Sequence, residues 1–356
     1  MGASSDAAGR RLIVRADASP SAGTGHLMRG LALAQAWRDR GGEVTWLLAE
    51  APLPLRQRIT DEGIDLRVLE PGDATRDAAA LAGALEGDGR AVAVVDGQAF
   101  DRDYLVAVGP AAGRVLVVDD AADRGAYDVG VVLNQNAHAD RGAYPADAPA
   151  RFLLGPAYAL LRREFRPDPP ARPVPARARH VLVAFGGADP SGMSRRALRA
   201  LAGLPEDVRG DLEVRLVAGA ANPDAGDLAG LARALAPGLR AGIERDVTDM
   251  PGLFAWSDLA LTSGGSAVWE MARMGVPALV VETVPVETLL AAGLSQVGLG
   301  DVLGRADDLD DATICAAVAR RIDDEAWRRT TAELGRLMVD GRGADRVVDA
   351  LLEEVP

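Results

Sequence analysis

Short runs of consecutive apolar residues alternate along the chain with longer helical or turn-rich segments. In the first half the runs occupy residues 12–14, 44–48, 64–69, 91–95 and 115–118, with two expected edge strands at 129–133 and 152–154. Continuous apolar runs of this length are typical of strands buried on both faces of a parallel sheet. Apolar residues recur at helical spacing from Leu27 to Trp37 and stop at Gly41, which predicts a helix after the first strand.

A proline-dense segment at residues 166–178 separates this half from a second half with the same pattern. Because proline fixes the backbone and removes a hydrogen-bond donor, the segment predicts a semi-rigid linker. The later elements expected are strands at 180–185, 214–217, 258–262 and 279–281, and helices at 193–204, from Pro251, and at 311–320, 324–339 and 344–353. The second half is therefore expected to be another doubly wound domain.

The predicted fold class is α/β, with two doubly wound, Rossmann-like domains that face each other across a cleft. The expected segments are a flexible tail at 1–10, an N-terminal domain at 11–165, the linker at 166–178, a C-terminal domain at 179–340 and a C-terminal helix at 341–356. Two domains also agree with the chain's length of 356 residues.

Composition excludes several functional classes. A formal net charge of -13 argues against binding to nucleic acid or to an anionic membrane surface, both of which need clustered Lys and Arg. The single cysteine, Cys315, excludes an internal disulfide and a thiolate metal site, and three histidines give no basis for a His-rich metal cluster. No signal-peptide pattern and no apolar stretch of about 20 residues is found, so a cytoplasmic protein is expected.

A glycine-containing loop follows the first predicted strand and carries a histidine at the start of the next helix. Gly23 and Gly25 permit a sharp turn and a close approach to a ligand, and the helix N-terminus favours an anion. The imidazole of His26 can move a proton at neutral pH. The same residues also fit a capped strand-to-helix turn with a half-buried histidine.

Polar residues follow three more predicted strands of the first half. They are Asp96, the pair Asp119-Asp120, and the triplet Asn134-Gln135-Asn136. Because the carboxyl ends of parallel strands line one edge of a sheet, the acids are expected near the His26 loop. Each acid taken alone also fits a helix cap, and the triplet also fits a turn.

A second glycine loop, Thr262-Ser-Gly-Gly-Ser266, follows a predicted strand of the second half and opens a helix. Its backbone N–H groups and Ser266 can hydrogen-bond phosphate oxygens. Glu270 lies one turn into that helix, where its carboxylate can accept hydrogen bonds from two ribose hydroxyls. The alternative is that Ser266 caps the helix and Glu270 stabilises its dipole.

Five motifs, in the same order over nearly the whole chain, resemble the PseG/SpsG family. They are residues 15–29 (Arg-Ala-Asp-Ala-Ser and Gly-Thr-Gly-His-Leu-Met-Arg), 154–165, 185–190 (Phe-Gly-Gly-Ala-Asp-Pro), 263–270 (Ser-Gly-Gly-Ser-Ala-Val-Trp-Glu) and 340–346. The best-known members are UDP-2,4-diacetamido-2,4,6-trideoxy-β-L-altropyranose hydrolases of pseudaminic acid biosynthesis, and MurG-type glycosyltransferases are distant relatives. The resemblance implies the glycosyltransferase B fold.

The resemblance also implies metal-independent hydrolysis without a cofactor: water attacks the anomeric carbon, UDP leaves and the configuration inverts. His26 matches the family's catalytic histidine and is expected to be the general base. The residues expected on the sugar side are Asp17, Gly23, Thr24, Gly25 and Tyr158. The residues expected to bind UDP are Gly186, Gly187, Val247, Ser263, Gly264, Gly265, Ser266 and Glu270. Asp17 is expected to orient His26 or touch the sugar, although a strand-end cap fits it equally well.

The sequence departs from the family at two places. Gly30 stands where a cysteine is usual, and the segment Glu282-Thr-Val-Pro-Val-Glu287 stands where the family has an Asn-Gln pair facing the sugar and the diphosphate. Buried sugar substituents need hydrogen-bond partners. Because of the second departure, the sequence does not identify which sugar the protein uses, or which acceptor.

Three functions therefore remain: a UDP-sugar hydrolase, a glycosyltransferase in which His26 deprotonates an acceptor, and a non-catalytic nucleotide-sugar binding protein. The first is the main prediction, with a UDP-sugar as substrate, UDP as product, and no nucleic acid or membrane partner. The sequence leaves the oligomeric state open, a monomer included.

Overall fold

The computed structural model describes residues 6–19, 23–86, 88–125, 127–170, 172–219, 222, 224–235, 238–245 and 247–354. The chain forms two compact units. The first comprises Met1–Arg166 and Gly341–Pro356, and the second comprises Pro167–Asp340.

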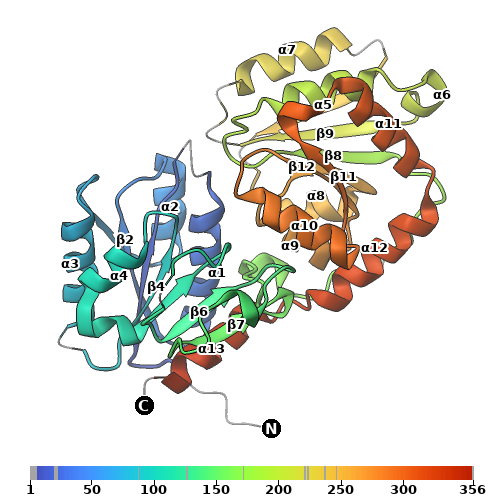
Figure 1. Ribbon diagram of the computed structural model, residues 1–356. Coiled ribbons are helices and arrows are strands. Elements are labelled where there is room, and N and C mark those ends of the chain that lie inside the picture. The colour runs from blue at the N-terminus through green and yellow to red at the C-terminus, as the bar shows by residue number, and fades with distance from the viewer. Residues whose placement is uncertain are drawn as a thin grey trace. The chain divides into compact units, whose positions relative to one another are not determined.

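The first unit is built on a seven-stranded parallel sheet with the strand order β3-β2-β1-β4-β5-β6-β7 (Figure 1). Its strands are β1 (Arg11–Ala16), β2 (Glu43–Leu48), β3 (Asp65–Val68), β4 (Val92–Asp96), β5 (Val115–Val118), β6 (Val131–Asn134) and β7 (Arg151–Leu154). Its α-helices are α1 (Gly25–Asp39), α2 (Leu53–Asp61), α3 (Ala74–Leu85), α4 (Arg102–Val108) and α13 (Gly343–Glu354).

Both faces of this sheet are covered, which explains the unbroken apolar runs. Leu12 and Val14 of β1 pack into one core with residues of α1 and α13, whereas Ile13 between them packs into a second core with residues of α3 and α4. Successive residues of a strand point to opposite faces, so the central positions of a strand covered on both sides are apolar, as they are in β1.

The second unit repeats the plan with a six-stranded parallel sheet in the order β10-β9-β8-β11-β12-β13. Its strands are β8 (His180–Ala184), β9 (Glu213–Ala218), β10 (Arg240–Arg245), β11 (Leu259–Ser263), β12 (Ala278–Glu282) and β13 (Asp301–Arg305). Its helices are α5 (Met193–Ala202), α6 (Glu206–Arg209), α7 (Ala225–Leu235), α8 (Met250–Trp256), α9 (Ala267–Met274), α10 (Glu287–Val297), α11 (Asp311–Ile322) and α12 (Glu325–Met338). Helices α5, α7 and α11 lie on one face of the sheet, and α8 and α9 lie on the other (Figure 1).

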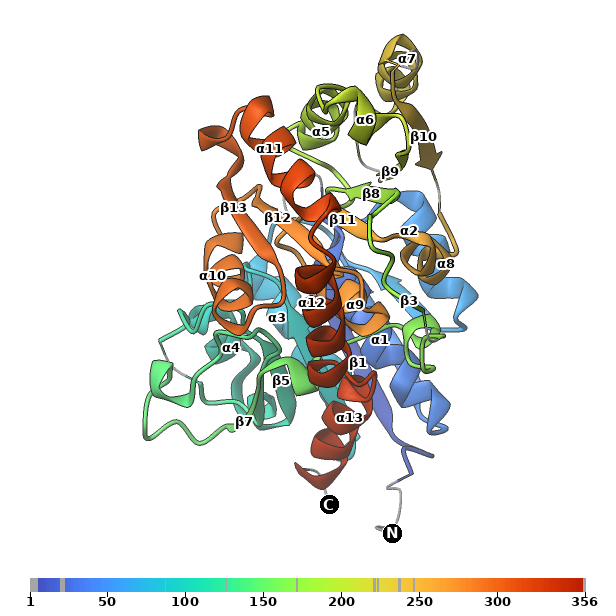
Figure 2. The same ribbon diagram turned by 90° about the vertical axis from the view of Figure 1, so that its right-hand side faces the viewer.

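These two sheets confirm the predicted α/β class and the two Rossmann-like halves. The sequence pattern missed two strands, β10 and β13, which lie at opposite edges of the second sheet (Figure 2). Both are only partly buried, so neither carries a continuous apolar run. The pattern also assigned the last helix to no domain, whereas α13 packs against α1 in the first unit.

The expected flexible tail at residues 1–10 is corrected in its second half, and residues 1–5 lie outside the described residues. Ala7 is fully buried, and its backbone N–H donates to the carbonyl of Arg40. Arg10 donates to the carbonyl of Leu352. These contacts fix the tail against the first unit just before β1.

Packing against Trp46 and Val14 explains why a glycine stands at position 30. A Cβ at this position would lie 2.9 Å from the ring of Trp46 and 3.0 Å from Val14, closer than side chains normally approach. Trp46 is fully buried and donates its indole N–H to the carbonyl of Ala16. The tryptophan therefore fills the space that a larger residue at position 30 would need.

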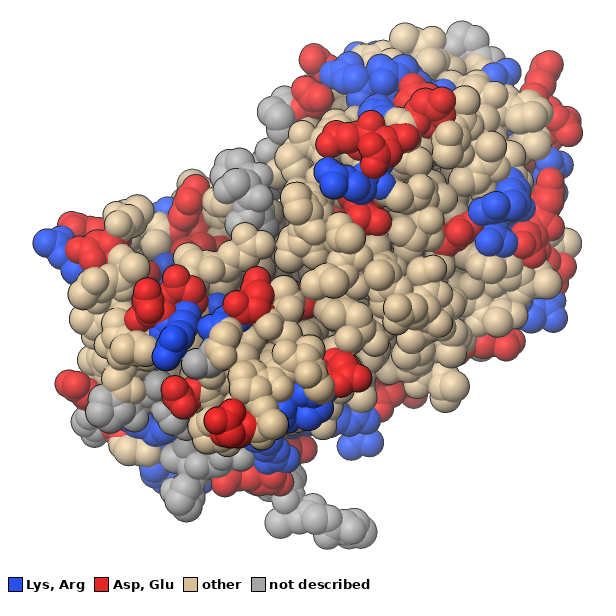
Figure 3. All heavy atoms as spheres, in the orientation of Figure 1, with Lys and Arg blue, Asp and Glu red and all other residues tan. Residues whose placement is uncertain are grey.

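Within the described residues, no helix is both long enough and apolar enough to cross a bilayer. On the face shown in Figure 3, acidic and basic side chains are interspersed among the described residues.

Candidate active site

The His26 loop lies where the strand order of the first sheet reverses. β1 and β4 are neighbours, with Ala16 opposite Asp96, but the order runs β1-β2-β3 to one side and β4 to β7 to the other. Ligands of doubly wound proteins bind at the carboxyl ends of the strands beside such a switch point. His26 after β1 and Asp96 at the end of β4 flank this point.

His26 and Asp96 are in direct contact. The ring Nδ1 of His26 lies 2.7 Å from Oδ1 of Asp96. The Asp96 side chain is 2% exposed, whereas the His26 side chain is 20% exposed. The histidine therefore has a buried carboxylate on one side and retains access to solvent.

Arg29, one helical turn after His26, joins this pair to a second acid. Its Nε donates to Asp96 Oδ2 at 2.9 Å and its Nη2 donates to Asp96 Oδ1 at 2.8 Å. Nη1 donates to both carboxylate oxygens of Asp120 at 2.9 Å. Asn136 donates to Asp120 as well, at 2.6 Å. The sequence expectation that the strand-end acids lie near the His26 loop is thus confirmed for Asp96 and Asp120.

The network keeps Asp96 charged. Burial by itself would raise the pKa of Asp96, but the guanidinium of Arg29 and the ring of His26 lower it to about 2. Arg29 carries one positive charge against two carboxylates, so the three groups have a net charge of -1. A proton gained by His26 would bring the cluster to neutrality.

The contacts of Nδ1 indicate which tautomer the histidine adopts. Nδ1 lies near Asp96 Oδ1 at 2.7 Å and near Arg29 Nη2 at 3.0 Å. A neutral ring nitrogen either donates or accepts, and an ionised carboxylate only accepts. Because the shorter contact is to the carboxylate, we assign the proton to Nδ1. Nε2 then carries the lone pair and can accept a proton from a ligand.

Asp17 does not orient His26. Its carboxylate pairs with Arg15 at 2.7 Å and accepts the backbone N–H groups of Ala49 and Glu50 at 2.8 and 3.1 Å. The strand-end role is therefore the one that the structure supports. Asp96 takes the position beside the histidine, and only strand pairing reveals this across 70 residues of sequence.

The other predicted residues of the sugar side have different surroundings. Gly23 adopts a positive φ of 72°, which a glycine tolerates, and Thr24 precedes α1 without a side-chain cap. Gly25 is the first residue of α1. Tyr158 ends a 3-10 helix and packs against the core shared by α1 and α13.

The triplet after β6 is largely structural. The amide of Asn134 donates to the hydroxyl of Tyr144, and Gln135 accepts the backbone N–H of Leu160 at 2.9 Å. Only Asn136 reaches the cluster, through Asp120.

In the second unit, the predicted UDP-binding residues follow strands that meet at one sheet edge. Gly186 and Gly187 follow β8, residues 263–266 end β11 and lead into α9, and Val247 follows β10. β8 and β11 are neighbours at the reversal of strand order, as β1 and β4 are in the first sheet. Ser266 caps no helical N–H with its side chain, which removes the cap interpretation.

The sequence analysis assigned no role of its own to Glu287, which also lies at this edge of the sheet. Glu287 opens α10 and is 6% exposed. Its Oε2 accepts the backbone N–H and the hydroxyl of Thr283 at 2.6 and 3.0 Å, and Gly264 also donates a backbone hydrogen bond to it. Burial raises the pKa of Glu287.

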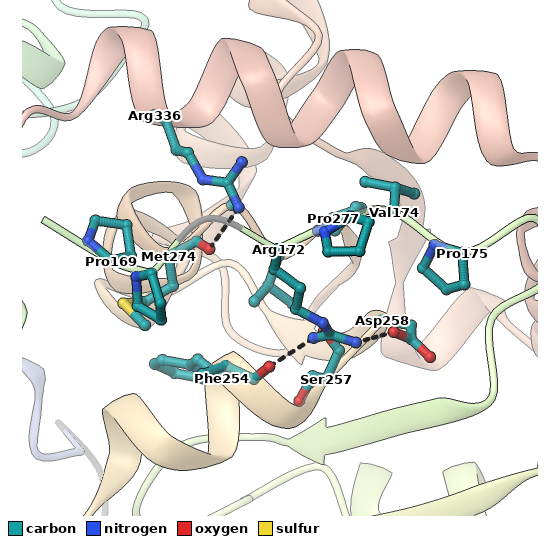
Figure 4. Close-up of a pocket in the computed structure, with 15 residues that line it drawn as sticks. Pro169, Arg172, Val174, Pro175, Phe254, Ser257, Asp258, Met274, Pro277 and Arg336 are labelled. Carbon is teal, nitrogen blue, oxygen red and sulfur yellow. Dashed lines mark hydrogen bonds and ion pairs between the residues drawn. The ribbon is translucent and has the colours of Figure 1, made fainter.

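The proline-dense segment predicted as a linker packs on the second unit and lines a pocket there (Figure 4). Arg172 donates to the carbonyl of Ser257 and pairs with Asp258, and Arg336 donates to the carbonyl of Met274 at 3.4 Å. None of the predicted site residues lines this pocket. Among the described residues, no group of three or more His, Cys, Asp or Glu side chains is placed to hold a metal ion.

Comparison with known proteins gives no match to any family model. The spore coat polysaccharide biosynthesis protein SpsG of Bacillus subtilis is 28% identical over 205 residues, 58% of this chain and 59% of SpsG. The uncharacterised protein MJ1062 of Methanocaldococcus jannaschii is 22% identical over 277 residues, 76% of this chain and 55% of that protein. The chain thus spans less than two thirds of the length of these two relatives.

A third relative aligns over almost its whole length. It is the UDP-N-acetylglucosamine--N-acetylmuramyl-(pentapeptide) pyrophosphoryl-undecaprenol N-acetylglucosamine transferase of Halorhodospira halophila, 31% identical over 90% of this chain and 92% of that enzyme. The chain belongs to the family of this transferase and is similar to SpsG. Solved structures of glycosyltransferases share its fold.

MurG of Acinetobacter baumannii superposes with a TM-score of 0.66 at 16% identity, covering 97% of this chain and 99% of that one. The glycotransferase of kitacinnamycin gives 0.68 at 18% identity, covering 99% and 100%. HepE of Anabaena, solved with UDP and glucose, gives 0.60 at 14% identity, covering 96% and 99%. These likenesses show the glycosyltransferase B fold.

Proposed function

We propose that this chain cleaves the bond between UDP and the anomeric carbon of a sugar, with His26 as the general base. One observation carries the proposal: Asp96 holds Nδ1 of His26 at 2.7 Å, at the switch point of the first sheet, and leaves Nε2 to take a proton. A general base of this kind contributes about 10²- to 10⁴-fold to a rate.

The family supports the choice of nucleotide. The transferase of H. halophila is named for a UDP-sugar, and HepE was solved with UDP. In this chain, the backbone N–H groups of Gly264, Gly265 and Ser266, just before α9, are the proposed donors to the diphosphate. Glu270 is proposed to hold the ribose, and Val247, Gly186 and Gly187 the rest of the nucleotide.

Water is the proposed nucleophile, since the motif order resembles that of UDP-sugar hydrolases. One proton of the water passes to Nε2 of His26 while its oxygen forms a bond to C1 of the sugar. The bond from C1 to the diphosphate oxygen breaks, and UDP leaves with the electron pair. Attack from the side opposite to UDP inverts the configuration. The net charge of -1 on the cluster of Arg29, Asp96 and Asp120 favours the imidazolium that forms.

Transfer to an acceptor is the second candidate, favoured by the match to a transferase over 90% of the chain. In that reaction, His26 would take the proton of an acceptor hydroxyl instead of water. All other roles stay the same.

A panel of UDP-sugars tests both reactions. UDP release and the anomeric form of the sugar are measured with and without acceptors. UDP with free sugar in buffer alone supports hydrolysis, and UDP release only with an acceptor supports transfer. We expect His26→Ala to lower turnover by about 10²- to 10⁴-fold.

The matched control is His180→Ala. His180 lies in the second unit and stacks near Trp256, with ring centroids 4.6 Å apart. This variant should keep full turnover. If His26→Ala is as active as the wild type, the proposed role of His26 is wrong, and tight UDP binding without turnover of any donor would indicate a binding protein.

A further inference from the structure

Glu287 lies against the glycine loop that the proposed function assigns to the diphosphate. A Cβ on Gly264 would be 3.1 Å from Cβ of Glu287 and 3.6 Å from its carboxyl carbon. A Cβ on Gly265 would be 3.7 Å from Oε1 of the same carboxylate. The side chain therefore occupies the space directly beside both glycines.

The hydrogen bonds of Glu287 are those of a bound anion. Its carboxylate accepts the backbone N–H groups of Thr283, Val284 and Gly264, and the hydroxyl of Thr283. Converging backbone N–H groups form the kind of site in which proteins hold phosphate. One N–H of the proposed diphosphate loop is thus already used by an internal carboxylate.

In the described part of the chain, no cation balances the charge of Glu287. Among the described residues, no arginine or lysine forms an ion pair with it, and the influences on its ionisation are burial and then hydrogen bonds. A nearly buried carboxylate without a counter-ion repels a second anion strongly, because little solvent screens the two charges. A diphosphate and the Glu287 carboxylate therefore compete for the same loop.

We propose that Glu287 is an internal competitor of the nucleotide diphosphate: its carboxylate occupies the anion site at Gly264, and UDP must displace it to bind. This inference rests on the proposed function, in which the Ser263–Ser266 loop holds UDP. Its consequence is selective, since the phosphate-bearing part of the ligand meets the competitor and the nucleoside does not. Glu287 thereby weakens retention of UDP after the sugar has left.

Glu287→Gln tests the competition. The glutamine carbonyl can still accept from Thr283, while the negative charge is removed and the amide can donate to phosphate. Titration calorimetry with UDP, inorganic pyrophosphate and uridine compares the variant with the wild type. We expect the Kd for UDP and for pyrophosphate to fall at least tenfold and the Kd for uridine to stay within twofold.

Glu282→Gln is the matched control. Glu282 ends β12, and its Oε2 accepts from the hydroxyl of Thr288 at 2.8 Å, so the control removes a nearby charge that does not touch Gly264. It should change the three Kd values by less than twofold. An equal gain in affinity in both variants, or an unchanged Kd for UDP in Glu287→Gln, would overturn the proposal.

The three ligands distinguish failure of the competitor role from failure of the UDP assignment. If UDP fails to bind while pyrophosphate binds more tightly to Glu287→Gln, the competitor role stands and the assignment of UDP fails. If UDP binds equally well to both forms, the competitor role fails and the proposed function stands. Should Glu287→Gln not fold, as judged by thermal unfolding, Glu287→Asp retains the charge but withdraws it from Gly264, and should also bind UDP more tightly.

Discussion

Replacing Asp96 by Asn is the sharpest test of the His26 site. The substitution keeps the size of the side chain but removes its charge and turns one oxygen into a donor. That donor must face either His26 Nδ1–H or the guanidinium of Arg29, both of which need an acceptor. We therefore expect the histidine to lose its fixed tautomer.

The size of the effect follows from the ionisation of Asp96. A pKa of about 2 against the ordinary value of 3.8 corresponds to about 2 kcal/mol of preference for the charged form. Arg29 and His26 both contribute to this preference. Without the charge of Asp96, the imidazolium that forms during the reaction loses this attraction. Loss of the tautomer adds to this, so kcat should fall by roughly 10²-fold or more.

Two measurements are needed, because a buried acid also affects folding. UDP release from the best donor gives kcat and KM, and long-range nitrogen–proton NMR correlations of the histidine rings give the tautomer. In the wild type we expect His26 to carry its proton on Nδ1. In Asp96→Asn, we expect a mixture of tautomers, a lower kcat and a nearly unchanged KM.

Asp119→Asn is the control. Asp119 follows the neighbouring strand β5 and is equally buried, but it accepts from the hydroxyl of Tyr127 and from backbone N–H groups and does not touch His26. The control should lower the melting temperature and leave the His26 tautomer unchanged. A wild-type His26 protonated on Nε2, or an Asp96→Asn enzyme with unchanged kcat, would refute the reasoning.

Three further predictions concern stability. Gly30→Ala should destabilise the protein by about 1–3 kcal/mol in urea unfolding, because the new Cβ would lie 2.9 Å from the ring of Trp46; an unchanged midpoint would contradict the packing argument. Gly343→Ala should cost at least as much, since its Cβ would lie 2.2 Å from the carbonyl oxygen of Ala159, and a thermal melt equal to that of the wild type would show that α13 can shift freely. The pKa of Asp96 is lower in the folded state than its ordinary value near 3.8, so its charge stabilises the fold above about pH 4 and this contribution, about 2 kcal/mol, disappears as the pH falls towards 2. Unfolding measured between pH 2 and 6 should therefore be steeper in acid for the wild type than for Asp96→Asn, and parallel curves would be the contrary result.

The local pattern of the chain was enough to predict the class of fold. Strands buried on both faces carry apolar residues on both, so β1, β4, β5, β8 and β11 are visible as short apolar runs. Edge strands lack this signal: β10 and β13 are only partly buried and were missed. The second half of the tail was predicted to be free because it carries no periodic pattern, yet Ala7 is fully buried in the core of the first unit and donates its backbone N–H to Arg40.

The candidate site was predictable in part. The glycine loop and the helix start mark His26 as a chemical group, and the strand-end acids mark one edge of the sheet. Which acid meets the histidine depends on strand pairing, and proximity in sequence pointed to Asp17 instead of Asp96. The contact between the Glu287 carboxylate and Gly264 could not be predicted from the sequence either, since only the packing of α10 against the β11–α9 loop brings the two together.

The sequence by itself determined the buried strands, their parallel arrangement and the residue types able to move a proton or hold an anion, because these depend on side-chain chemistry and short-range periodicity. The tertiary structure decided which of these side chains contact one another. A sheet of order 3-2-1-4 places the end of β4 beside the end of β1, and so joins His26 to an acid 70 residues away. Such pairings are set by how strands are ordered in space, and no local pattern in the chain encodes that order.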